Sequence, residues 1–225
     1  MAHAFFLGVD VADASADRPD GITVTLLDKD QADDADAATY RLNHIRHHDA
    51  DTSAEELADH LQGLVAEQPY IGRTSIVVNR ATDYGRVLVE ALEERGLNPV
   101  ATILTGPTGG TPAPEEETVH LRTASVVRTL AGLYRNDRLT MEDHSEEASR
   151  LARGAQRAAE LMDEADANVE TPEAAGSELN ELGEAGTHVT SAALAAWLGT
   201  ERSFDPSQHL KDEPRPEAPG ANTTA

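Results

Sequence analysis

Cysteine is absent from this 225-residue chain, and lysine occurs only twice, at Lys29 and Lys211. Without cysteine the chain forms no disulfide bond and offers no thiolate ligands for a structural zinc site. No apolar run approaches the ~20 residues that span a bilayer. The start of the chain also lacks the basic segment and long apolar stretch of a secretory signal. We therefore expect a cytoplasmic protein that has no membrane partner.

Positive charge is scarce, because acidic residues outnumber basic ones by 41 to 18 and the formal net charge is −23 at pH 7. Acid excess, few lysines and abundant alanine are together typical of a halophilic protein, since a Debye length of about 3 Å in molar salt screens the self-repulsion. The alternative interpretation is an acidic interaction surface or mimicry of nucleic acid. The charge also disfavours DNA binding driven by counterion release.

Hydrophobic periodicity and turn signals divide the chain into strands and helices. Strands are predicted at residues 4–10, 22–27, 39–46, 75–79 and 100–104. Helices are predicted after a cap at Thr52 or Ser53, from a cap at Asp83 to a stop at Gly96, and over residues 118–134, 145–163 and 188–198. The polar segment 28–36 is expected to link two strands, and segments 106–117 and 166–186 are expected to be loops.

The order of these elements predicts the fold class. Three strands with short polar links suggest an antiparallel meander, and helices alternate with strands after it. We expect an α/β domain of ribonuclease H-like type over residues 1–201, with a mixed sheet of an antiparallel meander and then parallel strands, flanked by helices. The proline-rich, charged segment 202–225 is expected to be a disordered tail.

An acid ends the first predicted strand, in the run Phe5-Phe6-Leu7-Gly8-Val9-Asp10. A carboxylate on a buried strand costs desolvation energy unless a cation or hydrogen-bond donors compensate it. Asp10 is therefore a candidate ligand of a divalent metal. The alternative is an aspartate that is bonded to backbone donors or to an arginine.

Four segments in chain order resemble the nuclease domain of phage large terminases, a family of the ribonuclease H-like superfamily. The first is Phe6-Leu7-Gly8-Val9-Asp10, and the second joins Ile76-Val77-Val78-Asn79 to a helix that contains Tyr84-Gly85-Arg86. The third is a helix that runs into Asn136-Asp137-Arg138-Leu139, and the fourth is Thr187-His188-Val189-Thr190-Ser191-Ala192-Ala193-Leu194-Ala195. The resemblance extends over most of the chain, from Phe5 to Trp197.

The resemblance implies a two-metal nuclease site that binds Mg²⁺ or Mn²⁺, in which several carboxylates converge on the ions. Only Asp10 carries over as a metal and catalytic carboxylate. The second acid of the family falls at Asn79, and its closing acids fall at Val189 and Thr190, so these three positions are degenerate. His188 occupies the position of the family's motif histidine.

Two functions follow as expectations. The first is a terminase-nuclease-like protein that is catalytically degenerate and acts as a phage- or prophage-related module of DNA packaging or nucleic-acid processing. Its partners would be DNA or a packaging motor protein, since the chain has no Gly-x-x-x-x-Gly-Lys-Ser/Thr motif of its own. The second is an active Mg²⁺- or Mn²⁺-dependent endonuclease that uses Asp10 with acids from shifted positions, namely Asp83 and Asp143. An actin-like or sugar-kinase protein is disfavoured, because segment 13–20 lacks a phosphate-binding loop.

Further candidates have ordinary alternatives. Asp83 also suits the start of a helix, as does Glu146. The cluster of His44, His47 and His48 with Asp49 and Asp51 indicates either a transition-metal site or a solvated strand end. The glycine-rich segment 106–110 indicates either a phosphate-binding loop or a simple connection.

Overall fold

The computed structural model describes residues 2–11, 21–31, 38–106, 118–142, 144–167, 177–178, 181–182 and 186–201. The expected tail at 202–225, nearly all of the loop expected at 106–117, and the candidate acid Asp143 lie outside the described residues. Within the described part, no helix combines the length and the apolar character needed to cross a membrane.

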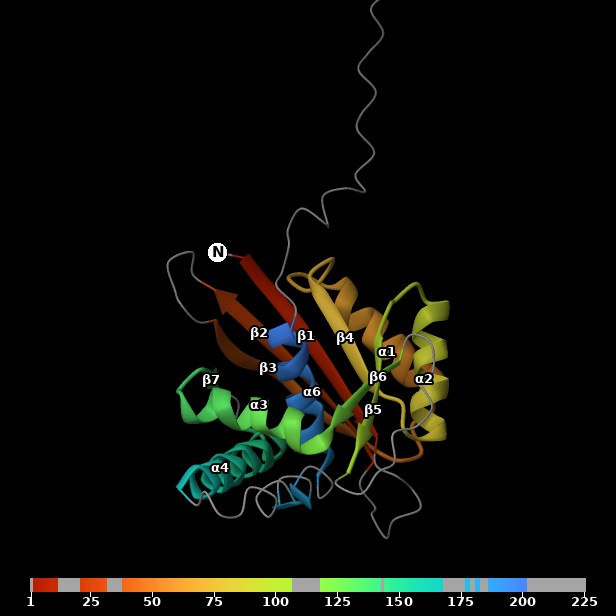
Figure 1. The fold of residues 1–225 in the computed structure, drawn as a ribbon. Helices are drawn as coiled ribbons and strands as arrows, with labels where there is room; N and C mark the ends of the chain where they lie inside the picture. Colours follow the sequence, from red (N-terminus) through yellow and green to blue (C-terminus); the bar gives the residue numbers. More distant parts are fainter. Residues whose placement is uncertain are drawn as a thin grey trace, which may run out of the picture.

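Among the described residues, seven strands form one sheet in the order β6-β5-β4-β1-β2-β3-β7 (Figure 1). Their bounds are β1 Ala2–Val11, β2 Ile22–Gln31, β3 Thr39–His48, β4 Thr74–Asn79, β5 Val100–Thr105, β6 Thr118–Arg122 and β7 Leu139–Thr140. β1, β2 and β3 are an antiparallel meander, whereas β4, β5 and β6 run parallel to β1. The central order β3-β2-β1-β4-β5, with β2 reversed, is the ribonuclease H-like arrangement, so the predicted fold class is confirmed.

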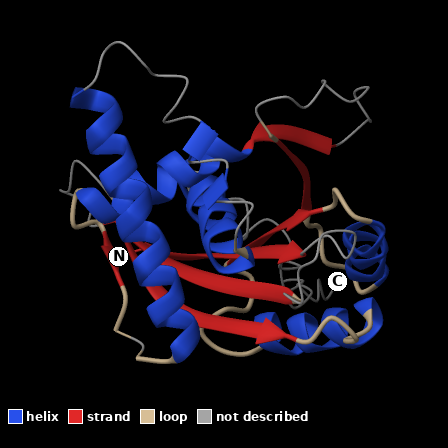
Figure 2. Cartoon of the chain, turned by 90° about the horizontal axis from the view of Figure 1, so that it is seen from below, coloured by secondary structure: helices blue, strands red, loops and turns tan. Residues whose placement is uncertain are grey.

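In the described part of the chain, five helices cover the two faces of the sheet (Figures 1 and 2). Their bounds are α1 Ala54–Ala66, α2 Asp83–Glu94, α3 Thr123–Arg135, α4 Glu146–Ala167 and α6 Thr187–Glu201. Side chains alternate along β1, so that Phe5, Leu7 and Val9 join the core under α1 and α2, while Ala4 and Phe6 join the core under α3, α4 and α6. The result is a three-layer α/β/α domain.

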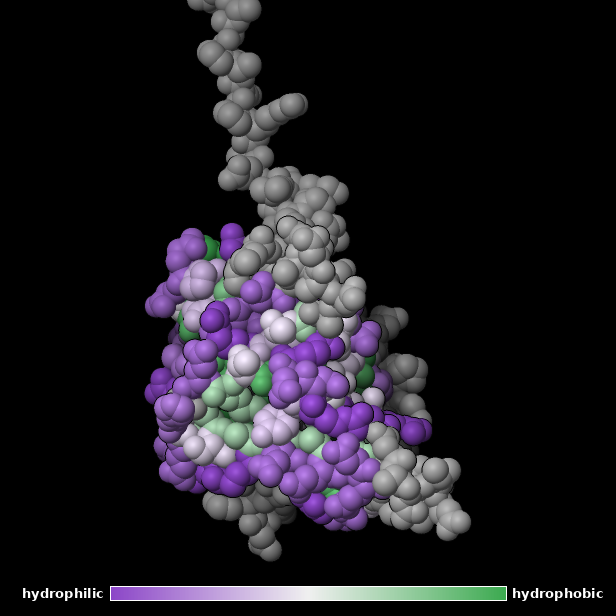
Figure 3. Space-filling view, turned by 90° about the vertical axis from the view of Figure 1, so that its left-hand side faces the viewer, coloured by the Kyte–Doolittle hydropathy of each residue, from purple (hydrophilic) through white to green (hydrophobic). Residues whose placement is uncertain are grey.

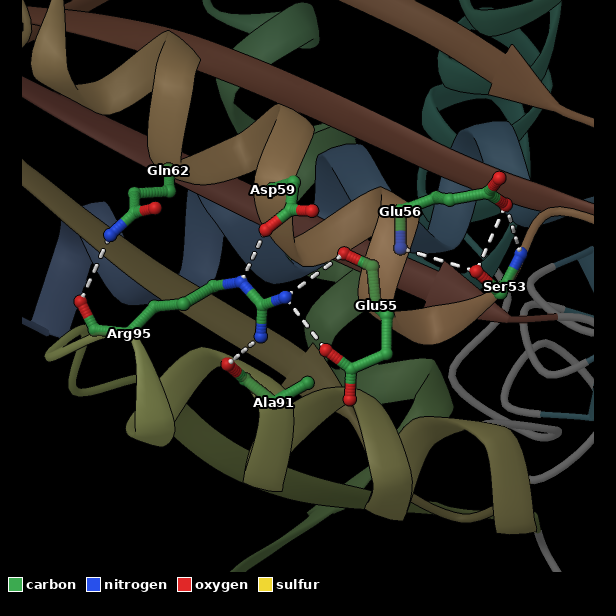
Figure 4. Close-up of polar contacts among 7 residues, drawn as sticks. All are labelled: Ser53, Glu55, Glu56, Asp59, Gln62, Ala91 and Arg95. Atoms are coloured by element: carbon green, nitrogen blue, oxygen red, sulfur yellow. Dashed lines mark hydrogen bonds and ion pairs between the residues drawn. The ribbon is translucent and has the colours of Figure 1, made fainter.

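An arginine joins α1 and α2, the two helices on one face of the sheet (Figure 4). The Arg95 side chain, at the end of α2, donates to Glu55 Oε2 at 2.6 Å and to Asp59 Oδ1 at 2.7 Å, both on α1. It also donates to the Ala91 carbonyl at 2.7 Å, within α2. α1 begins at a capping box in which Ser53 and Glu56 each accept from the other's backbone N–H, which confirms Ser53 as the cap.

The helical layer on the other face of the sheet is built around α6, which has twelve buried residues among its 15. Three side chains of β2 bind it along its length: Thr23 to Thr187 at 2.6 Å, Thr25 to Ser191 at 2.7 Å, and Lys29 Nζ to the Gly199 carbonyl at 2.7 Å. Where α6 crosses β1 the two backbones nearly touch, because a Cβ atom on Gly8 would lie 2.0 Å from the Ser191 carbonyl oxygen. Hydrophobic packing and matched hydroxyl pairs therefore fix α6 on the sheet.

One face of the molecule is mostly hydrophilic. Figure 3 shows this face, on which hydrophobic residues appear as one pale green area and a few separate green spots. Among the described residues, the large hydrophobic side chains that are exposed are Ile71, Val87 and Val119.

The prediction of a helix over residues 118–134 is wrong at its start. Residues Thr118–Arg122 form the edge strand β6, and the helix α3 begins only at Thr123. The segment Thr-Val-His-Leu-Arg alternates polar and apolar residues, which suits a strand. The segment forms a strand because the edge of β5 is available for pairing, and β6 pairs with it from Ala101↔Thr118 to Thr105↔Arg122.

The expected link at 28–36 is also wrong in its first part, because β2 continues to Gln31. Charged residues are depleted in strands, so Asp28 and Lys29 resemble a loop in the sequence. In the fold both are buried, and each has a partner: Asp28 accepts from Arg41 Nη2 at 2.7 Å, and Lys29 binds the end of α6. A short strand, β7, was not expected, and the cap of α2 is Thr82 rather than Asp83.

Candidate functional site

A row of polar side chains crosses the sheet beneath the start of α6. Strand pairing places Thr102 beside Asn79, Asp10 beside Thr23, and Thr23 beside His47. Asn79 and Asp10 complete the row, because they are hydrogen-bonded to each other. All five residues belong to the face that packs against α6, since residues paired across a sheet point to the same side.

The centre of the row is the contact between Asp10 and Asn79. The Asn79 Nδ2 amide donates to Asp10 Oδ1 at 2.8 Å, and the two residues are only 6% and 8% exposed. Asn79 Oδ1 accepts from the Ala81 backbone N–H at 3.3 Å, which fixes the amide with its NH₂ group toward the carboxylate. Asp10 therefore has a neutral hydrogen-bond donor where the resemblance would place a second acid.

The first turn of α6 covers the other half of the row. The Thr23 hydroxyl is hydrogen-bonded to Thr187 at 2.6 Å and to His47 Nδ1 at 3.2 Å. The His188 ring stacks on the His47 ring, with a centroid distance of 5.4 Å and an angle of 12° between the planes. His188 is 8% exposed, so the motif histidine of the resemblance is part of a packed contact between α6 and β3.

The two positions that correspond to the closing acids are used for packing. Val189 is 5% exposed and belongs to the core, and its Cγ2 atom lies 2.3 Å from where a Cβ atom of Gly154 would be, so it packs closely on α4. Thr190 is 3% exposed, and its hydroxyl donates to the Gly186 carbonyl at 3.4 Å.

Asp83 and Glu146, two acids that could replace the missing metal ligands, each pair with an arginine on their own helix in the described structure. Asp83 is the first residue of α2, its side chain is 91% exposed, and its carboxylate pairs with Arg86. Glu146 is the first residue of α4 and pairs with Arg150 at 2.7 Å. Asp83 and Glu146 both take the local role of an acid in the first turn of a helix.

The residues present at the site do not fit a Mg²⁺ or Mn²⁺ pair. A two-metal site needs several carboxylates around ions about 3.5–4 Å apart. Here Asp10 has the amide of Asn79 and the hydroxyl residue Thr23 on the two neighbouring strands, and no group of three histidines or acids suited to a metal occurs in the described part of the chain. The arrangement binds α6 to the sheet, and we derive no metal-dependent step from it.

The histidine cluster is divided between the two faces of the sheet. His47 faces α6, whereas His48 faces α1 and lies edge to face with His60 at a centroid distance of 5.5 Å. Burial, together with the nearby Arg46, His60 and His44, lowers the pKa of His48 to about 4. The cluster thus lies at a strand end, in agreement with the second of the two interpretations. His44, His47 and His48 are, however, partly buried rather than solvated.

Sequence reasoning missed the hydroxyl and lysine partners of α6. Thr23 and Thr25 occupy odd positions of β2, between apolar residues at even positions, and Lys29 has the same parity further along the strand. That alternation was the available signal, because polar residues on the second face of a buried strand require partners from whatever covers it. The covering helix is more than 160 residues away in the sequence, so its identity was not available.

Comparison with known proteins gives no further constraint on the site. No protein-family model, no curated protein and no solved structure matches the chain.

Proposed function

We propose that this protein is a terminase-nuclease-like module whose metal site has degenerated, and that it acts in DNA packaging or nucleic-acid processing by binding rather than by hydrolysis. The observation that carries the proposal is the buried hydrogen bond from Asn79 Nδ2 to Asp10 Oδ1. The fold supports the likeness to this class of nuclease, since Asp10 and Asn79 lie on β1 and β4, side by side at the ends of two parallel strands.

The chemistry of the pair supports loss of hydrolysis. An amide N–H that donates to a carboxylate oxygen occupies one of its lone-pair sites, and it adds no negative charge to hold a divalent ion. This donor to the buried Asp10 carboxylate is a side-chain amide, whereas the alternative drawn from the sequence was backbone donors or an arginine. Val189 further reduces the acid count, because an apolar residue there serves the α4–α6 contact.

The chain's charge bears on the partner. With a net charge of −23, contact with bare DNA gains little from counterion release, and that gain fades further in molar salt. We therefore infer that the protein contacts nucleic acid through a basic partner protein, such as the motor of a packaging machine, rather than by direct binding. Direct binding to duplex DNA in molar KCl, measured by fluorescence anisotropy, would make the partner unnecessary.

The decisive experiment measures Mn²⁺ binding and DNA cleavage by the purified chain and by Asn79→Asp. We expect no cleavage by the wild-type protein with Mg²⁺ or Mn²⁺, and Mn²⁺ binding, read by electron paramagnetic resonance, that is at least about tenfold tighter in Asn79→Asp. Asp83→Asn, which removes an exposed acid, is the matched control and should leave Mn²⁺ binding unchanged.

Cleavage by the wild-type protein that Asp10→Asn abolishes would contradict the proposal and establish the active endonuclease instead. If Asp83→Asn abolished it as well, the second acid would be identified as Asp83. Circular dichroism of each variant shows whether a loss of activity reflects a loss of fold.

A further inference from the structure

A second site lies on the other face of the sheet and at the other end of β1. A cavity of about 400 Å³ is lined by Phe5, Asp28, Arg41, Asn43, Pro69, Tyr70 and Arg73. Phe5 and Asp10 are five residues apart on β1, so their side chains point to opposite faces, and the cavity is separate from the Asp10–Asn79 contact. Its volume lies within the range of small-molecule sites, about 300–1,000 Å³.

The floor of the cavity is rigid and charged. Phe5, Asp28 and Arg41 are neighbours across β1, β2 and β3, and Phe5 and Asp28 are only 2% and 3% exposed. Arg41 Nη2 donates to Asp28 Oδ2 at 2.7 Å, which holds its guanidinium against the sheet. Hydrogen bonding to Asp28 and the charge of that carboxylate raise the pKa of Arg41, so the arginine stays charged.

The opposite wall comes from the turn between α1 and β4. Tyr70 stands edge to face on Phe5, with a centroid distance of 4.9 Å, and is only partly buried, so it is the ring that a ligand can reach. Arg73 is exposed beside it, and the described structure shows no side-chain hydrogen bond or ion pair for this guanidinium. The Asn43 amide, also exposed, is likewise without a side-chain partner among the described residues.

The residues that line the cavity carry a small positive charge. Two arginines and one aspartate give the lining a charge of +1, in a chain of net charge −23, and the carboxylates of Asp30 and Glu142 also act on Arg41. A guanidinium fork binds phosphate in a bidentate manner, and an aromatic side chain offers a surface on which a nucleobase stacks. Arg73, which has no side-chain partner among the described residues, supplies the guanidinium and Tyr70 supplies the ring, while Asn43 offers an amide for the base edge.

We propose that this cavity binds a nucleobase together with its 5′-phosphate, with the phosphate on Arg73 and the base on Tyr70. The same chemistry is presented by a free nucleoside monophosphate and by the phosphorylated end of a single strand. The proposal stands apart from the degenerate nuclease site, because it uses no residue of that site.

The test titrates the full chain, in molar KCl, with adenosine monophosphate, with ribose 5-phosphate, and with an oligodeoxynucleotide with or without a 5′-phosphate, each by isothermal calorimetry. We expect the nucleotide or the phosphorylated strand end to bind and ribose 5-phosphate to bind at least about tenfold more weakly, because it lacks the base. Binding of the monophosphate alone assigns the site to free nucleotides, and binding of the phosphorylated strand alone assigns it to strand ends.

Two variants locate the site. Arg73→Gln and Tyr70→Leu should each weaken binding about tenfold, while Arg128→Gln, an exposed arginine on α3 at the opposite face, should not. The backbone bonds of Arg73 to Phe5 and Tyr70 do not depend on its side chain, so the fold is retained in Arg73→Gln. The proposal is overturned if neither adenosine monophosphate nor the 5′-phosphorylated strand binds, or if ribose 5-phosphate binds as tightly as the nucleotide. It is also overturned if Arg73→Gln binds these ligands like the wild type.

Discussion

Adding a single methyl group at Gly8 should detach α6 from the sheet. A Cβ atom at this position would lie 2.0 Å from the Ser191 carbonyl oxygen and 2.9 Å from the Ala195 nitrogen. Both are backbone atoms of α6, so no side-chain rotation relieves the contact. Gly8→Ala must therefore move the helix or the strand by more than 1 Å to reach the ordinary contact distance of about 3.5 Å.

The cost of Gly8→Ala can be estimated from the contacts that the shift disturbs. Overpacking a well-packed core costs about 1–3 kcal/mol. The hydrogen bonds of Thr23 to Thr187, at 2.6 Å, and of Thr25 to Ser191, at 2.7 Å, would both lengthen, at about 1 kcal/mol each. We expect a loss of about 3–5 kcal/mol, a large part of the 5–15 kcal/mol typical of a domain.

The matched control is Gly132→Ala in α3, where nothing lies within 4 Å of the added Cβ atom. This change should leave stability equal or raise it by up to about 1 kcal/mol, because alanine favours a helix. Denaturant unfolding in molar KCl, followed by circular dichroism, gives both free energies. The one tryptophan of the chain, Trp197, lies on α6, so its fluorescence reports whether that helix remains docked.

A Gly8→Ala variant that unfolds within about 0.5 kcal/mol of the wild type, with unchanged Trp197 emission, would refute this reasoning. It would mean that α6 does not cross β1 at backbone contact distance. The polar row beneath the first turn of α6 would then need another account.

Two further predictions concern a buried lysine and a partly buried histidine. Lys29→Ala should cost about 2–3 kcal/mol in denaturant unfolding, because it removes both the donor to the Gly199 carbonyl and a buried aliphatic stem. Lys29→Met, which keeps most of the stem, should cost less, and equal costs would contradict the contribution of the stem. The pKa of His48 is lowered to about 4, so its contribution to stability is complete above the ordinary value of 6.5 and is lost as the pH falls toward 4. Unfolding free energies of the wild type and His48→Gln should converge over that interval by about 2 kcal/mol, after allowance for partial exposure, and a constant difference would contradict the shift.

The fold was predictable because its signals are local. The alternation along β1, the capping box at Ser53 and the glycine at residue 96 each act within a few residues. Together they specify a meander followed by alternating helices and strands, and the chain offers few other ways to bury those apolar faces.

The elements that were mispredicted depend on distant partners. β6 is a strand because the edge of β5 is available to it, and β2 extends through Asp28 and Lys29 because Arg41 and the end of α6 compensate their charges. Residue propensities predict a loop or a helix for a charged or mixed segment, because propensities carry no information on partners that are distant in the sequence.

The candidate site was predictable only as a list of residue types. That Asp10 is an acid and that Asn79, Val189 and Thr190 are not acids follow from the sequence. The burial of Asp10, its bond to Asn79 and the stack of His188 on His47 exist only in the fold. A carboxylate can ligate a metal or accept an amide, and its neighbours in space decide between them.

By itself, the sequence determined the charge of the protein, the absence of thiol chemistry and the antiparallel meander of β1, β2 and β3, because each depends on composition or on neighbours along the chain. Only the tertiary structure decided which polar residues share a row, which helix covers them, and that Arg73 and Tyr70 face Asp28 across one cavity. These features join residues up to 170 positions apart. Their positions are set by sheet register and helix packing, which no local pattern encodes.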